Sequence, residues 1–108
     1  MKIIGVEKFG GPEALTVLDV AEPHAGPGEV RIRVHAAAVS PTDTVLRAGG
    51  QGTGNLPAVP GMDAAGVIDE TDGSGGWQAG DRVMAIALPL GEHRGAYQEF
   101  LVAPADSI

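Results

Sequence analysis

Apolar and polar residues alternate most regularly along residues 29–35. One face of an extended chain would be apolar and the other basic, with Val30, Ile32 and Val34 set against Arg31, Arg33 and His35. This period of two predicts a β-strand with one face in the core and the other in water. Five further apolar runs have the length and composition of strands, and they cover residues 2–8, 14–20, 64–71, 82–88 and 96–102. We expect the first two of these to form a hairpin.

The pattern becomes that of a helix after residue 39. Ser40 is a favoured N-cap residue, Pro41 suits the first helical position, and Asp43 stands three residues after the cap. Gly49 follows the last residue of the segment and can end a helix in a left-handed conformation. These signals predict a short helix over residues 40–48.

Glycine and proline interrupt the rest of the chain. The 17 glycines and 8 prolines indicate many tight turns, and residues 56–61 contain too much proline for a central strand. The glycine cluster at residues 50–54 is not followed by a helix, so we interpret it as a loop and not as a phosphate-binding turn. The cluster at residues 73–76 is interpreted as a hairpin turn. We therefore predict a mainly β fold of about six short strands and one short helix.

Composition limits the choice of partners. The chain has 108 residues, enough for one domain, and its 14 acidic and 7 basic residues give a formal charge of −7. This charge predicts neither nucleic acid nor an anionic membrane as a partner. No apolar run is long enough to span a bilayer, and the first residues resemble a strand and not a signal peptide. We expect a soluble, cytoplasmic protein.

Few residues carry candidate chemistry. There is no cysteine, and the histidines at 24, 35 and 93 lack the spacing of metal ligands, so we predict no metal site. The segments Ser40-Pro41-Thr42-Asp43 and Met62-Asp63 remain, each at a bend between apolar stretches. Ser40 and Asp43 also fit a capping box, and spacing alone favours that structural role. A carboxylate at position 63, before an apolar strand, is expected to be hydrogen-bonded, functional or both.

An ordered set of short motifs extends this interpretation. It comprises Phe9-Gly10-Gly11-Pro12-Glu13, Pro27-Gly28-Glu29-Val30, Ser40-Pro41-Thr42-Asp43, Leu56-Pro57, Pro60-Gly61, Gly66-Val67, Gly80-Asp81-Arg82-Val83 and Gly95-Ala96-Tyr97. In this order the chain resembles the N-terminal catalytic domain of the medium-chain dehydrogenase/reductase superfamily. The resemblance implies a GroES-like, partly open β-barrel with one or two short helices over residues 1–108. It also implies that these residues are a fragment of a two-domain enzyme, whose Rossmann domain is absent from this chain.

The resemblance also separates two branches of that superfamily. Zinc-dependent alcohol dehydrogenases carry cysteine where this chain has Ser40, and histidine followed by glutamate where it has Met62-Asp63. Serine and thioether are poor substitutes for thiolate and imidazole as zinc ligands. The chain is therefore similar to the zinc-independent NADPH:quinone oxidoreductases.

That group transfers hydride from nicotinamide to a quinone or an activated alkene. The resemblance assigns catalytic roles to Ser40, Thr42 and Asp43, cofactor contacts to Ser40, Pro41 and Asp43, and the substrate cleft to Met62 and Asp63. Thr42 matches a hydroxyl that relays protons in the zinc enzymes. The implied cofactor is NADPH, the implied full-length assembly is a homodimer, and the chain alone is expected to be inactive. The alternative is a free-standing GroES-like binding module without catalytic activity.

Overall fold

The computed structural model describes residues 1–50 and 56–108, and its regular elements are mostly strands. Within these ranges the strands are β1 (Lys2–Val6), β2 (Leu15–Asp19), β3 (Glu29–Ala37), β4 (Asp63–Thr71), β5 (Arg82–Ile86) and β6 (Phe100–Pro104). One α-helix, α1, covers Pro41–Ala48, and three 3-10 turns cover Pro12–Ala14 (η1), Ser74–Gly76 (η2) and Ala105–Ser107 (η3). The mainly β prediction is confirmed. The loop predicted at residues 50–54 lies, apart from residue 50, outside the described residues.

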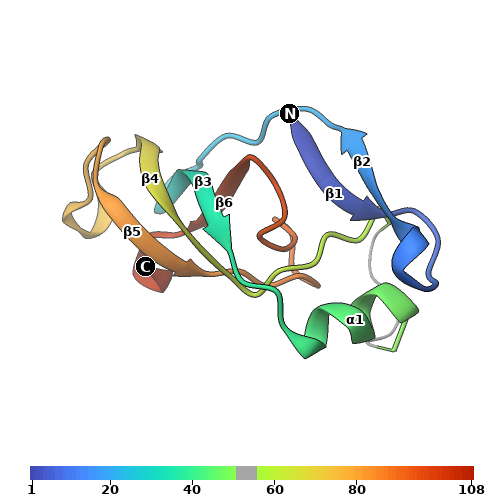
Figure 1. The fold of residues 1–108 in the computed structure, drawn as a ribbon. Helices are drawn as coiled ribbons and strands as arrows, with labels where there is room; N and C mark the ends of the chain where they lie inside the picture. Colours follow the sequence, from blue (N-terminus) through green and yellow to red (C-terminus); the bar gives the residue numbers. More distant parts are fainter. Residues whose placement is uncertain (51–55) are drawn as a thin grey trace.

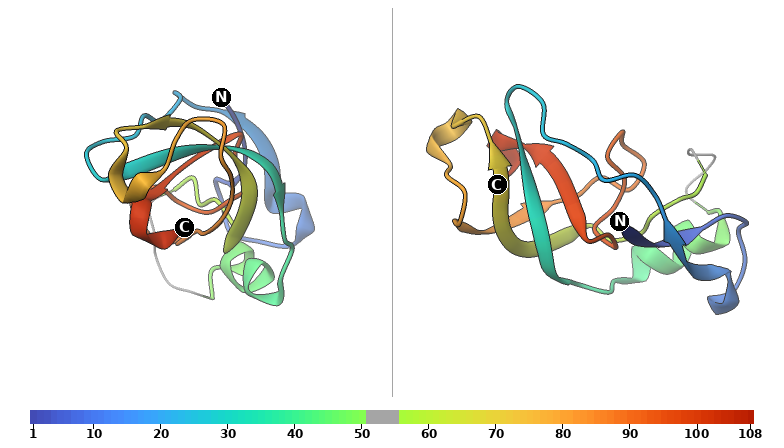
Figure 2. Two further views of the ribbon diagram at one scale, coloured as in Figure 1. Left: turned by 90° about the vertical axis from the view of Figure 1, so that its left-hand side faces the viewer. Right: turned by 90° about the horizontal axis from the view of Figure 1, so that it is seen from above.

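The strands form two antiparallel sheets. β1 and β2 make the predicted hairpin, and the larger sheet has the order β5-β4-β3-β6 (Figure 1). This larger sheet curls around its own core (Figure 2). Its two edge strands, β5 and β6, both contribute to the wall of one cavity of about 420 Å³. The sheet is thus a barrel that is not closed, as the resemblance implied.

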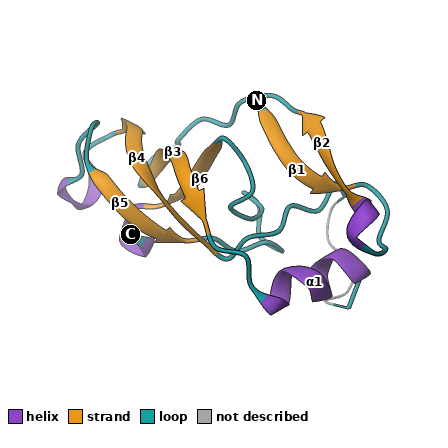
Figure 3. Cartoon of the chain, in the orientation of Figure 1, coloured by secondary structure: helices purple, strands orange, loops and turns teal. Residues whose placement is uncertain are grey.

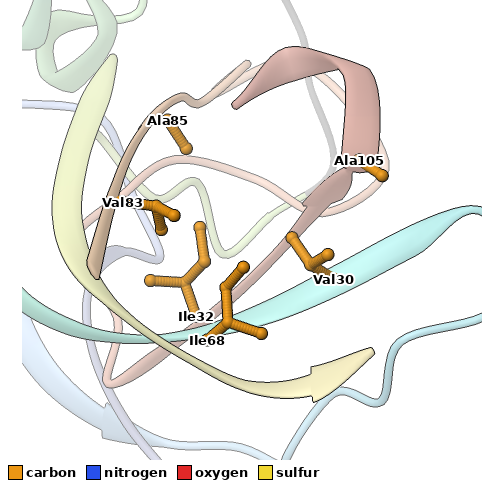
Figure 4. Packing of buried hydrophobic residues seen from close by; sticks show 6 residues of the cluster. All are labelled: Val30, Ile32, Ile68, Val83, Ala85 and Ala105. Carbon is orange, nitrogen blue, oxygen red and sulfur yellow. The ribbon is translucent and has the colours of Figure 1, made fainter. Parts of the chain in front are cut away.

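The main core lies inside the curled sheet. Its buried side chains point toward one another from β3, β4, β5 and η3 (Figure 4), and they are Val30, Ile32, Ile68, Val83, Ala85 and Ala105. Burying an isoleucine or valine side chain contributes about 1.5–3 kcal/mol. The indole of Trp77 packs against this cluster and donates a hydrogen bond to the Ala105 carbonyl at 3.0 Å. The alternation predicted along β3 therefore supplies the barrel interior.

The other face of β3 is not uniformly wet, which corrects the prediction at Arg31. This side chain is buried at 9% exposure, whereas Arg33 and His35 are exposed as expected. Its guanidinium donates two hydrogen bonds to Asp69 on β4, at 2.9 and 3.0 Å, and lies 4.4 Å from the ring centre of Phe100 on β6. The Asp69 carboxylate raises the pKa of Arg31 above its ordinary value. The ion pair with Asp69 and the contact with the Phe100 ring offset the free-energy cost of burying the guanidinium.

The last strand begins later than residues 96–102 suggested. β6 covers Phe100–Pro104, and the segment from Gly95 to Tyr97 instead hydrogen-bonds to the loop at residues 59–61. Long-range backbone pairing decided this boundary, because alternation along one strand does not reveal its partner. The proline-rich segment 56–61 forms no strand, as predicted, and only Ala58 makes an isolated bridge, with Val6. The glycines at residues 73–76 lie in the connection between the antiparallel strands β4 and β5, as expected for a hairpin turn.

The molecule is elongated, with extents of 41 × 24 × 22 Å. The curled sheet occupies one end, while the hairpin and α1 occupy the other (Figure 3). Leu46 of α1 packs there with Val6 and Ala58 in a separate, smaller core. The chain passes from β3 of the larger sheet into the first turn of α1, so that turn lies near the junction between the two ends (Figure 1). Among the described residues, no helix has both the length and the apolar character needed to cross a bilayer.

Candidate functional site

The predicted helix signals are confirmed at both ends of α1. Ser40 is the N-cap residue with extended backbone, and Gly49 ends the helix at φ 87° in the left-handed region. The backbone N–H of Ser40 donates to Asp43 Oδ2 at 2.8 Å, as in a capping box. The capping role that spacing favoured for Asp43 is therefore present in the structure.

Asp43 does more than cap the helix. Its side chain is buried, with 6% exposure, and accepts two further hydrogen bonds. The backbone N–H of Gly61 donates to Oδ1 at 2.9 Å, and the Tyr97 hydroxyl donates to Oδ2 at 2.9 Å. The carboxylate thus joins three segments that are distant in sequence, which is how a buried charge is normally stabilised.

Tyr97 was absent from the residues selected by sequence as candidates for the site. It lies within the Gly95-Ala96-Tyr97 motif and is the only tyrosine of the chain. Burial, together with its bond to the Asp43 carboxylate, raises the pKa of Tyr97 to about 12. The phenol therefore stays protonated and remains a donor well above neutral pH.

The free energy of unfolding is expected to fall as the pH rises from 10 toward 12. The unfolded chain loses its phenol proton near the ordinary pKa of 10, whereas the folded chain keeps it up to about 12. Above pH 10 the unfolded state thus binds fewer protons, and stability decreases with pH. Urea unfolding at several pH values on both sides of 10 measures this slope. Tyr97→Phe should flatten it, and an equal slope in that variant would contradict the assignment.

Ser40, Thr42 and Met62 come together beside Asp43. The hydroxyl oxygens of Ser40 and Thr42 are 2.7 Å apart, and the Thr42 hydroxyl donates to Met62 Sδ at 2.9 Å. Pro41 is exposed at the first position of α1. The two predicted segments are therefore in direct contact, although 20 residues of chain separate Thr42 from Met62.

Asp63 does not join this group through any hydrogen bond in the described part of the chain. Its side chain is exposed, and Oδ1 accepts a hydrogen bond from the Ala38 backbone N–H at 3.3 Å. Of the two roles expected for a carboxylate at this strand start, the structure supplies the hydrogen-bonded one. The alternation along β4 turns its side chain away from the core, since the next residue, Ala64, is buried.

A pocket of about 220 Å³ opens beside these residues. Its walls are mainly apolar, and the lining residues are Thr42, Asp43, Leu46, Met62, Leu88, Pro89 and Leu90. Residues 88–90 follow β5 and were not selected from the sequence. Leu88 and Leu90 are 66% and 55% exposed, so each leaves a large apolar side chain in solvent. The strand predicted over residues 82–88 ends at Ile86, and the apolar run Leu88-Pro89-Leu90 was the sequence signal that could have identified this wall.

The metal-ligand chemistry of the site is weak. In residues 1–50 and 56–108, no three histidine, cysteine, aspartate or glutamate side chains come close enough to hold an ion together. His24 contacts Glu70 at 3.0 Å and His93 contacts Glu29 at 2.6 Å, both remote from α1 in sequence. Sequence spacing did not indicate these glutamate partners, because each pair is separated by more than 40 residues.

The sequence matches a known protein family that agrees with this fold. The model of the alcohol dehydrogenase GroES-like domain matches residues 26–108. The chain belongs to this family. The matched residues include the larger sheet, α1 and the residues that line the pocket. Relatives also match the chain over its whole length.

Two solved structures and one curated relative illustrate these similarities. The quinone oxidoreductase of Sus scrofa is 37% identical over 114 residues, which span 100% of this chain and 32% of the pig protein. The human synaptic vesicle membrane protein VAT-1 homolog-like protein superposes with a TM-score of 0.88 at 29% identity, over 99% of this chain and 33% of that one. The Escherichia coli quinone oxidoreductase complexed with NADPH gives a TM-score of 0.83 at 27% identity, over 99% and 32%. The GroES-like domain therefore spans about a third of the length of these relatives.

Proposed function

We propose that this GroES-like domain is the catalytic-domain portion of an NAD(P)H-dependent oxidoreductase that transfers hydride to a quinone or an activated alkene without zinc. The observation that carries the proposal is the pocket beside α1, in which the Thr42 hydroxyl meets a wall of apolar side chains. Among the described residues that line it, Asp43 alone carries a carboxylate, and that carboxylate already accepts three hydrogen bonds within the domain. Such a pocket suits a flat, uncharged, conjugated acceptor.

The same residues fit one end of a dinucleotide and not the other. Helix N-termini bind phosphate well, but the N-terminus of α1 is already capped by the Asp43 carboxylate. The apolar wall and the neighbouring hydroxyls suit a nicotinamide ring, which Ser40, Pro41 and Asp43 would contact. When bound, NADPH would supply the hydride. The pyrophosphate would require a second domain, which agrees with a chain that spans a third of its relatives.

The chain itself supplies proton transfer and exclusion of water. An acceptor that gains a hydride becomes an anion and takes up one proton at oxygen or carbon. The Ser40 and Thr42 hydroxyls, 2.7 Å apart, can relay this proton from solvent: Thr42 would give its hydroxyl proton to the acceptor and take one from Ser40, which would take one from water. The side chains of Leu88 and Leu90 would exclude water from one side of the pocket. Met62, through its contact with the Thr42 oxygen, helps to orient that hydroxyl.

The zinc-free part of the proposal rests on the donors at two positions. Ser40 and Met62 stand where zinc enzymes of the superfamily carry a thiolate and an imidazole. A neutral hydroxyl and a thioether bind Zn²⁺ weakly. The hydroxyl of Thr42 is already hydrogen-bonded to the Met62 sulfur, so the geometry favours their mutual contact.

The function is tested with the complete gene product, because the domain spans only a third of its relatives. We expect it to oxidise NADPH in the presence of 1,4-benzoquinone or an enone, and to contain no stoichiometric zinc. Thr42→Ala should lower kcat by about 100-fold if its hydroxyl relays the proton. Thr44→Ala is the matched control, since that hydroxyl bonds to the Pro41 carbonyl and does not line the pocket.

Several outcomes would count against this proposal. Absence of NADPH oxidation with every acceptor, together with capture of a specific ligand or protein, would favour the alternative of a GroES-like binding module. One zinc per chain would contradict the metal-free mechanism. The homodimer of the complete enzyme and its cytoplasmic location remain proposals, which size-exclusion chromatography and cell fractionation would test.

A further inference from the structure

Three segments meet at the buried carboxylate of Asp43. The first turn of α1, the loop at residues 59–61 and the segment at residues 95–97 each donate one hydrogen bond to it, at 2.8–2.9 Å. The two loop segments are also joined directly. Three backbone N–H groups of residues 95–97 donate to the carbonyls of Val59, Pro60 and Gly61, each at 3.0 Å. These backbone hydrogen bonds fix the position of residue 97, and its hydroxyl therefore lies beside Asp43.

The docking of these loops leaves no free space at Gly61. Its φ of 103° lies in the region that favours glycine, and an added Cβ would come within 2.8 Å of the Ala96 nitrogen and 2.9 Å of Tyr97 Cδ1. Close backbone approach of this kind permits one arrangement and excludes sliding of one loop along the other. The position of Gly61 is therefore set by Asp43 on one side and by residues 96 and 97 on the other.

This arrangement continues into the pocket wall. Met62 follows Gly61 and places its sulfur 2.9 Å from the Thr42 hydroxyl oxygen. The carbonyl of Met62 accepts a hydrogen bond from the Ala87 backbone N–H at 2.9 Å, and Ala87 directly precedes Leu88. A path of hydrogen bonds and peptide bonds therefore leads from the Tyr97 hydroxyl, through Asp43 and Gly61, to both sides of the pocket.

We propose that Tyr97 is a positioning residue of this pocket, whose hydroxyl, acting through Asp43, holds Gly61 and so sets the contact of Met62 with Thr42. Tyr97 itself does not line the pocket. Its role in turnover rests on the reductase function proposed above. Its effect on the position of Met62 does not, and that effect can be measured without any catalysis.

The first test follows Met62 by NMR in the 108-residue chain with labelled methionine methyl groups. The chain has three methionines, so the exposed Met84 serves as an internal reference. Tyr97→Phe is expected to displace or broaden the Met62 signal and to leave Met84 unchanged. Trp77→Phe is the matched control, because it also removes one hydrogen bond from an aromatic side chain, at the Ala105 carbonyl and away from the pocket.

A second measurement keeps the Tyr97 hydroxyl and changes only its acidity. Because the chain has a single tyrosine, replacing tyrosine by 3-fluorotyrosine changes only position 97 and makes its phenol more acidic. The Met62 signal should then titrate together with the phenol absorbance, at a lower pH than in the unlabelled protein. This arm decides the question even if Tyr97→Phe does not fold.

The kinetic test uses the complete gene product. Tyr97→Phe should lower kcat/KM for the quinone by about tenfold through misplacement of the reacting groups, with a smaller change in KM for NADPH, whose pyrophosphate would be held by the second domain. A Met62 signal that stays in place in Tyr97→Phe and in the fluorinated chain would overturn the proposal, whatever the stability of the variant. A displaced Met62 signal in a protein without reductase activity would support the positioning role and refute the proposed function.

Discussion

Replacing Gly95 by alanine is expected to lower the free energy of unfolding by at least about 3 kcal/mol. An added Cβ would run into the carbonyl oxygens of Val59 and Pro60, closer than nonbonded atoms can approach. These atoms belong to backbone that is itself hydrogen-bonded to residues 95–97, so it cannot yield without breaking those bonds. Equilibrium unfolding in urea, followed by the fluorescence of the single tryptophan, measures the loss.

Gly10→Ala is the matched control for this substitution. A Cβ at that position meets only Ala14 Cβ and Glu13 Oε1, both at 3.6 Å, an ordinary contact distance. We expect a change within about 0.5 kcal/mol for this variant. If Gly95→Ala were as stable as Gly10→Ala, the close docking of the two loops would be wrong.

Replacing Asp43 by alanine is expected to cost about 3–5 kcal/mol of unfolding free energy. The change leaves three donors without their acceptor, namely the backbone N–H groups of Ser40 and Gly61 and the Tyr97 hydroxyl. A helix cap alone would cost about 1 kcal/mol, so the size of the loss separates the two roles. Urea unfolding at neutral pH provides the measurement.

Asp63→Ala provides the comparison, because it removes a carboxylate of the same kind from an exposed position with one hydrogen bond of 3.3 Å. Its effect should stay within about 0.5 kcal/mol. A loss of only about 1 kcal/mol for Asp43→Ala would reduce that residue to an N-cap and would remove the basis for the positioning role of Tyr97.

The helix and its first turn were predictable because their causes are local. Ser40, Pro41 and Asp43 act on groups within three residues along the chain, and Gly49 acts on the last turn. The face of β3 that carries Val30 and Ile32 followed from alternation, since burial on one face imposes a period of two. These predictions needed no knowledge of which segments would become neighbours.

Other features depended on partners that sequence spacing does not reveal. Arg31 was expected in water, but Asp69 is its partner on the neighbouring strand. The wall at residues 88–90 and the hydroxyl of Tyr97 join the site through the return of the chain past α1 and the 59–61 loop. Their positions result from strand pairing and loop docking, and each involves residues far apart in the chain.

By itself, the sequence determined the mainly β class, the bounds of the one helix and the two polar segments at residues 40–43 and 62–63. Local propensity and alternation suffice for these, because they act within a few residues. Only the tertiary structure decided that Asp43 is a buried junction and Asp63 an exposed residue. An aspartate can be buried where the fold places hydrogen-bond donors around its carboxylate. At Asp43 the distant donors are the Gly61 backbone N–H and the Tyr97 hydroxyl.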